Sequence, residues 1–158
     1  MLMLATWEEL VAGESCPLCL PRPHHNEFAY FVRKLSVSSL YLAREQSYMG
    51  TCSLVYDRRH VVRIDQLTAD EWSELAQDIR KAEVGIFRAL KPDHVNVESL
   101  GNTVPHLHWH IIPRYRHDGR WGNPIWTTLR DEMPQRSLAD TEYREMADRI
   151  NSGIDCVV

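Results

Sequence analysis

The sequence predicts an α+β fold built on an antiparallel sheet, and three features of the chain lead to this class. Short β-prone runs follow one another in the first part of the chain and again in its second half. One long segment between them has the apolar spacing of an amphipathic helix. Shorter helical segments stand near both ends. Because the strands meander and the helices are segregated from them, an antiparallel sheet is favoured over a parallel one.

The first predicted element is a short helix over Trp7–Ala12. Thr6 and Glu9 have the spacing of a capping box, and Gly13 is placed to end the helix. The chain then reaches Cys16-Pro-Leu-Cys19. In a chain without a secretory signal, a C-x-x-C pair is typical of a metal site or a redox pair rather than of a structural disulfide.

The next predicted elements are strands followed by the long helix. The runs 28–43 and 51–56 are rich in Phe, Tyr, Val and Leu, and we expect them to form strands of a meander or hairpin. The hydroxyl of Thr68 can cap a helix to which Glu71 reaches back. Apolar residues continue at helical spacing as far as Leu90, and Pro92 ends the helix. This apolar stripe predicts core packing rather than a cofactor site.

The second half of the chain predicts two more strands and a last helix. Two short β runs, 95–97 and 104–112, are separated by a turn that contains Gly101-Asn102. The stretch 116–123 is polar and rich in turn residues. A modest amphipathic helix is predicted over Leu138–Ile150.

Length and charge limit the kind of protein. At 158 residues with 44% apolar side chains, the chain can bury a core and is expected to form one domain over 1–158. A net charge of -4 argues against general nucleic-acid binding, although Arg114, Arg116 and His117 could hold a small polyanion. No apolar run approaches the roughly 20 residues of a membrane span, and the first residues lack the features of a secretory signal. We therefore expect a cytoplasmic protein that does not enter membranes.

The most informative segment is His106-Leu-His108-Trp-His110, inside the predicted strand 104–112. Side chains alternate along a strand, so the three imidazoles are expected to share one face. Imidazole is the side chain best suited to act near neutral pH as a nucleophile, an acid, a base or a metal ligand. The histidines therefore indicate either a metal site, with His108 and His110 among its ligands, or covalent catalysis at a phosphorus atom. Spacing alone does not choose between the two.

The residues around these histidines resemble the signature of the histidine triad (HIT) family, which is written His-φ-His-φ-His-φ-φ with φ apolar. The segment from Gly101 to Arg114 fills every position of that pattern. The similarity extends upstream through 56–67 and Asn96, and downstream to Trp121 and Trp126. The whole chain resembles the bacterial members described as diadenosine tetraphosphate hydrolase-like.

This resemblance implies distinct catalytic and substrate-binding roles. His108 would attack the α-phosphorus of a nucleotide, giving a nucleotidyl-histidine that water hydrolyses. His110 would contact the α-phosphate and stabilise charge in the transition state. Asn102 and Thr103 match positions that reach the phosphates or the leaving group, and Asn96 matches a substrate-binding Asn on the neighbouring strand. Transferases of the sugar-nucleotide branch carry Gln at the third position, so His110 favours hydrolysis.

The resemblance also implies a structural zinc site. Zinc-containing members of the family combine a Cys pair with a His after the second hairpin strand and with the first His of the triad. Here those positions are held by Cys16, Cys19, His60 and His106. Two thiolates and two imidazoles suit tetrahedral Zn²⁺, and His106 would then serve both the catalytic triad and the metal. His24 and His25 are candidates in place of His60. The alternative is a vestigial Cys pair, with His106 hydrogen-bonding only within the triad.

The family further implies a five-stranded antiparallel sheet, a long helix over 69–90 packed across it, a C-terminal helix, and homodimers. The leading hypothesis is a hydrolase of dinucleoside polyphosphates or related nucleotidyl compounds. The alternatives are a zinc-water hydrolase that uses the three histidines as ligands, and a non-catalytic nucleotide-binding module. The preferred base, the polyphosphate length, and the choice between phosphoanhydride and phosphoramidate substrates stay open.

Overall fold

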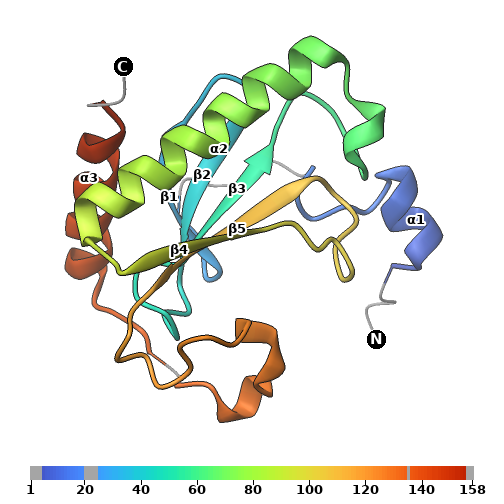
Figure 1. Ribbon diagram of the computed structural model, residues 1–158. Coiled ribbons are helices and arrows are strands. Elements are labelled where there is room, and N and C mark those ends of the chain that lie inside the picture. Colours follow the sequence, from blue (N-terminus) through green and yellow to red (C-terminus); the bar gives the residue numbers. More distant parts are fainter. Residues whose placement is uncertain (1–4, 20–24, 135, 156–158) are drawn as a thin grey trace.

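The computed structural model describes residues 5–19, 25–134 and 136–155 and contains a five-stranded sheet (Figure 1). The strands lie in the order β1-β2-β3-β5-β4, and each neighbouring pair is antiparallel. Their bounds are Ala29–Lys34 for β1, Ser38–Ala43 for β2, Cys52–Tyr56 for β3, His94–Glu98 for β4 and His108–Arg114 for β5. The predicted α+β class is confirmed, and so is the five-stranded antiparallel sheet that the family resemblance implied.

The α-helices described are α1 (Trp7–Ala12), α2 (Ala69–Leu90) and α3 (Asp140–Asp155). Single 3₁₀ turns occur at Ile64–Gln66 (η1), Ile125–Thr127 (η2) and Arg130–Glu132 (η3). Both predicted capping boxes are present, at the N-termini of α1 and α2, and both helices have their predicted bounds. None of the helices in the described ranges has the length and apolar character needed to cross a membrane.

Helix α2 crosses one face of the sheet, and α3 lies beside it (Figure 1). The side chains on this face are apolar: the register aligns Leu40, Leu54 and Trp109 across three strands. They join Leu75 and Ile86 of α2 in the main buried cluster. Burying one large apolar side chain contributes roughly 1.5–3 kcal/mol, so this layer supplies much of the driving force for folding. The opposite face of the sheet carries both polar and apolar side chains, among them His110, Val55 and the buried Ile112.

Helix α3 begins at Asp140 and runs to Asp155, beyond the predicted end at Ile150. The reason is a close contact with α2, in which a Cβ atom on Gly153 would lie 2.5 Å from the carbonyl oxygen of Gly85. Glycine usually ends a helix when only local preferences act. Here the missing side chain lets the two helices approach, so tertiary packing prolongs α3.

Strand β5 begins at His108 and not at Val104, so the prediction of three histidines on one strand is wrong for His106. Pro105 has no N–H to give to a sheet. The N–H of His106 donates to the carbonyl oxygen of Val104 at 2.8 Å, which forms a turn just before the strand. His108 and His110 share one face of β5 as predicted. His106 precedes the strand and lies in a separate environment.

Candidate catalytic and metal sites

The sheet face opposite α2 carries the two strand histidines. One row across this face consists of Tyr41, Ser53, His110 and Glu98, from β2, β3, β5 and β4. The next row places Val55 of β3 beside His108. The imidazole rings of His108 and His110 are half-buried, and their centroids lie 5.1 Å apart in an edge-to-face arrangement. Two imidazoles thus stand side by side on a surface that a ligand can reach.

His108 is held by a hydrogen bond that fixes its tautomer. Its Nδ1 lies 2.6 Å from the backbone carbonyl oxygen of His106. Because a carbonyl oxygen only accepts, Nδ1 carries the hydrogen and Nε2 of the neutral ring carries a lone pair. The same bond would stabilise positive charge on the ring if Nε2 formed a bond to an electrophile. This is the arrangement expected of a histidine nucleophile.

His110 is surrounded by aromatic rings. The indole of Trp126 lies edge-to-face with it at a centroid distance of 5.4 Å, and Trp126 Nε1 donates to the carboxylate of Glu98. Burial, and to a smaller extent the charge of His108, lowers the pKa of His110 to about 4. His110 is therefore uncharged at neutral pH. It can offer one ring N–H to a phosphate oxygen while its other nitrogen accepts.

The predicted metal ligands come together as a cluster. The ligand atoms of Cys16, Cys19, His60 and His106 all lie within 4.8 Å of one another. His106 Nδ1 is 3.5 Å from Cys16 Sγ and 3.3 Å from Cys19 Sγ, and His60 Nδ1 is 3.2 Å from Cys19 Sγ. Ligand bonds of normal length around tetrahedral zinc place N and S ligand atoms about 3.5 Å apart. The cluster therefore has the dimensions to hold a metal ion such as zinc.

The second nitrogen of each imidazole supports the same conclusion. His106 Nε2 lies 2.7 Å from the carbonyl oxygen of Tyr56, and His60 Nε2 lies 3.0 Å from that of Val11. Each Nε2 must donate to its carbonyl, which leaves an unprotonated Nδ1 on the side of the cysteines. Backbone acceptors thus orient both rings as Nδ1 ligands.

Two further sequence-based candidates have other partners. His25 stacks on Tyr30 with ring centroids 3.7 Å apart and is not part of the metal cluster, and His24 lies outside the described residues. Arg114, part of the suggested polyanion site, is 4% exposed and forms a salt bridge of 2.8 Å with Asp118. Its guanidinium is therefore neutralised inside the protein.

The predicted substrate-binding residues are divided between two places. Asn102 and Thr103 are exposed in the turn that precedes His106. Asn96 lies on β4 opposite Ile112, and its Oδ1 accepts a hydrogen bond of 3.1 Å from Arg114. The substrate contacts of all three stay predictions.

The loop after β5 contributes a part of the site that local sequence patterns do not predict, although the family similarity extends to Trp126. Ile125 in this loop is buried against Tyr48 and Ile112, and this anchor places the adjacent Trp126 beside His110. The available signal was the apolar Ile125 between polar stretches and two tryptophans. No local rule connects such a residue with a particular strand face.

Comparisons with known proteins give a family match. A family model described as HIT domain matches residues 38–117. The chain is 36% identical over 81 residues to the asymmetrical bis(5′-nucleosyl)-tetraphosphatase of Schizosaccharomyces pombe, a match that covers 48% of this chain and 44% of that protein. The chain spans about half the length of the curated relatives it matches.

Solved structures share the whole architecture. The histidine triad protein blr8122 from Bradyrhizobium japonicum has a TM-score of 0.73 and 25% identity, covering 87% of this chain and 99% of that one. A zinc-bound histidine triad family protein from Mycobacterium smegmatis has a TM-score of 0.60 and 16% identity, covering 90% of this chain and 94% of that one. The second likeness concerns the fold alone.

Proposed function

Because the chain belongs to the histidine triad (HIT) family, we propose that it hydrolyses dinucleoside polyphosphates or related nucleotidyl compounds with His108 as the nucleophile. The observation that carries this proposal is the hydrogen bond from His108 Nδ1–H to the carbonyl oxygen of His106, which leaves the lone pair on Nε2. Distant homologues are dinucleoside polyphosphate hydrolases, which supports the substrate class.

The proposed reaction has two displacements at one phosphorus. In the first, His108 Nε2 forms a bond to the α-phosphorus while the bond to the leaving-group oxygen breaks, and the polyphosphate departs with that electron pair. In the second, water attacks the nucleotidyl-histidine, the P–N bond breaks, and a nucleoside monophosphate and a proton are released. Neutral His110 would donate a hydrogen bond to an α-phosphate oxygen in both steps. Asn102 and Thr103 are proposed to contact the phosphates from the turn before His106.

We assign zinc to the separate cluster and give it a structural role. Four protein ligands, Cys16, Cys19, His60 and His106, would close a tetrahedral site, and a closed site has no position for a reactive water. Bound there, zinc supplies structural stabilisation and polarises His106. This arrangement favours histidine chemistry over the zinc-water alternative, in which His108 and His110 would be ligands. We also propose that the chain forms the homodimer expected of its family.

Replacing His108 tests the proposed mechanism. The His108→Ala variant should keep the far-UV circular dichroism and nucleotide affinity of the wild type while turnover of diadenosine tetraphosphate falls by about 10⁴-fold or more. Mass spectrometry of acid-quenched wild-type reactions should reveal a nucleotidyl adduct that the variant lacks. Unchanged turnover in the variant would remove the covalent mechanism. Nucleotide binding without hydrolysis by the wild type would instead favour the non-catalytic module.

A further inference from the structure

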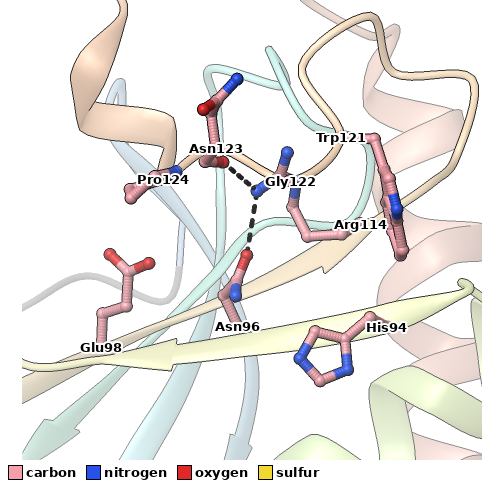
Figure 2. Close-up of a pocket in the computed structure, with 8 residues that line it drawn as sticks. All are labelled: His94, Asn96, Glu98, Arg114, Trp121, Gly122, Asn123 and Pro124. Carbon is pink, nitrogen blue, oxygen red and sulfur yellow. Dashed lines mark hydrogen bonds between the residues drawn. The ribbon is translucent and has the colours of Figure 1, made fainter.

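A pocket of about 340 Å³ lies between β4 and the loop that follows β5 (Figure 2). The lining side chains used below are His94, Asn96, Glu98, Arg114, Trp121 and Pro124. Figure 2 shows Asn96 and Glu98 pointing from β4 toward the loop that carries Trp121 and Pro124, with His94 on the same strand. Binding sites for small organic molecules begin at roughly this size, so the pocket can accommodate a group such as a nucleoside.

The pocket is on the same sheet face as the catalytic histidines. The register places Glu98 directly opposite His110, and His94 directly opposite Arg114. Directly opposed side chains of an antiparallel pair point to the same face. Glu98 also accepts the hydrogen bond from Trp126, whose indole contacts His110. A substrate that spans the histidines can therefore continue past Glu98 into the pocket.

The chemistry of the lining favours a flat, uncharged group over a phosphate. Arg114 donates to Asp118 at 2.8 Å, to Asn96 at 3.1 Å and to the carbonyl oxygen of Asn123 at 2.9 Å, so its guanidinium is committed to the protein. The indole of Trp121 is 44% exposed and offers a stacking surface. The amide of Asn96 and the carboxylate of Glu98 can pair with base edges or sugar hydroxyls.

The loop is also held in place, which distinguishes a built pocket from a chance depression. Arg114 Nη2 donates to the carbonyl oxygen of Arg120 at 2.8 Å, next to Trp121 in the chain. The guanidinium carbon lies 5.1 Å from the ring centroid of the buried Tyr48. The exposed Trp121 thus follows a backbone segment that the buried Arg114–Asp118 salt bridge holds, so less ordering of the loop is needed on binding.

We propose that this pocket binds the nucleoside of the leaving group, so that Trp121 selects substrates with a second nucleoside at the far end of the polyphosphate. The inference rests on the proposed function, because it needs the first nucleotide to be placed with its α-phosphorus at His108. It assigns to the loop after β5 a role in specificity and none in bond cleavage.

A pair of substrates isolates the second nucleoside. Diadenosine tetraphosphate and adenosine 5′-tetraphosphate share the polyphosphate and differ only in that group. For the wild type we expect a KM about ten-fold lower for the dinucleoside, the size of a base–aromatic stacking effect. Trp121→Ala should remove this difference without changing the KM of adenosine tetraphosphate, and Trp121→Phe should largely keep it. Leu129→Ala is the matched control, because Leu129 is an exposed apolar residue of the same loop that does not line the pocket.

The same comparison can be made without turnover. In the His108→Ala background, calorimetric dissociation constants for the two ligands should differ about ten-fold, and Trp121→Ala should make them equal. Equal wild-type constants for the two ligands, or an equal loss for both in Trp121→Ala, would overturn the pocket assignment while leaving the His108 mechanism intact. An active His108→Ala enzyme would instead overturn the proposed function, and the binding ratio would still decide the role of the pocket.

Discussion

His106 and His110 stand four positions apart in the sequence, but the protein surrounds them in different ways. His106 is 3% exposed, and its two ring nitrogens face the carbonyl oxygen of Tyr56 and the cysteine pair. His110 is half-buried on the open sheet face, beside Trp126 and Glu98. The first environment orients a ring for a metal, and the second keeps a neutral ring next to a ligand-accessible surface.

The difference shows how one short segment can serve stability and chemistry together. The partners of His106 come from the N-terminal segment and from the end of β3, so the contacts of this imidazole connect distant parts of the chain. The partners of His110 come from β4 and from the loop after β5, which also borders the pocket. Substitutions around His106 should therefore mainly lower the stability of the fold. Substitutions around His110 should mainly alter substrate binding and turnover.

The largest effect is expected from replacing a cysteine of the metal cluster. Cys16→Ser replaces a fully buried member of the cluster. We therefore expect the variant to lose the proposed zinc and about 4 kcal/mol of stability, the contribution of a ligand present at a thousand times its Kd. Elemental analysis and calorimetric unfolding with and without a chelator measure both quantities. Cys52→Ala is the control, since it removes a buried core thiol outside the cluster. Full zinc content in Cys16→Ser would contradict the assigned ligand set.

A smaller effect is expected from Gly13, which lies between α1 and the cluster. Gly13 has φ of 82°, and a Cβ there would lie 2.9 Å from Cγ of His60. Gly13→Ala should cost about 2 kcal/mol through backbone strain and displacement of the ring, and should weaken zinc binding. Gly119 has φ of 77° with open space around it, so Gly119→Ala should cost only the strain and leave zinc affinity unchanged. Equal zinc affinities in the two variants would show that Gly13 does not position His60.

The metal cluster around His106 could be predicted from the sequence to a greater extent than the surroundings of His110 and the adjacent pocket. Cys16 and Cys19 are close in sequence, and the family pattern points to the distant His60 and His106, so the sequence predicts all four members of the cluster. The capping boxes of α1 and α2 likewise depend on residues three positions apart, which is why their bounds were predicted. Local spacing carries this kind of information well.

The rest depends on contacts that spacing does not encode. The position of Trp126 beside His110 follows from burial of Ile125 against Tyr48, a residue far upstream. Arg114 looked like a surface cation, but its salt bridge with Asp118 forms only when the loop folds back on β5. The α-helical Gly153 similarly packs against Gly85 of another helix. Each of these is decided by tertiary packing rather than by neighbours in the sequence.

Replacing His110 should change how the free energy of unfolding depends on pH. The folded protein holds the pKa of His110 at about 4, whereas the unfolded chain has its ordinary pKa of about 6.5. Between these values the unfolded state binds a proton that the folded state does not, so stability falls as the pH is lowered. Urea unfolding is compared at pH 7 and pH 4.5, and the loss of stability between them should be about 2 kcal/mol smaller for His110→Asn than for the wild type. Other acid-sensitive groups are common to both proteins, and equal losses would show that His110 is not kept neutral by burial.

The smallest effect is expected from the ring that borders His110. Trp126→Ala exposes the imidazole to water, so the pKa of His110 should rise from about 4 by roughly half a unit to one unit. Trp126→Phe keeps an aromatic ring and loses only the N–H donated to Glu98, so it should leave this pKa closer to the wild-type value. An NMR titration of the imidazole C–H signals measures the shift directly. Trp72→Ala is the control, because the indole of Trp72 lies near Trp109 on the opposite side of β5. A rise in that variant as large as in Trp126→Ala would mean that general loosening of the sheet, and not cover by Trp126, controls the protonation of His110.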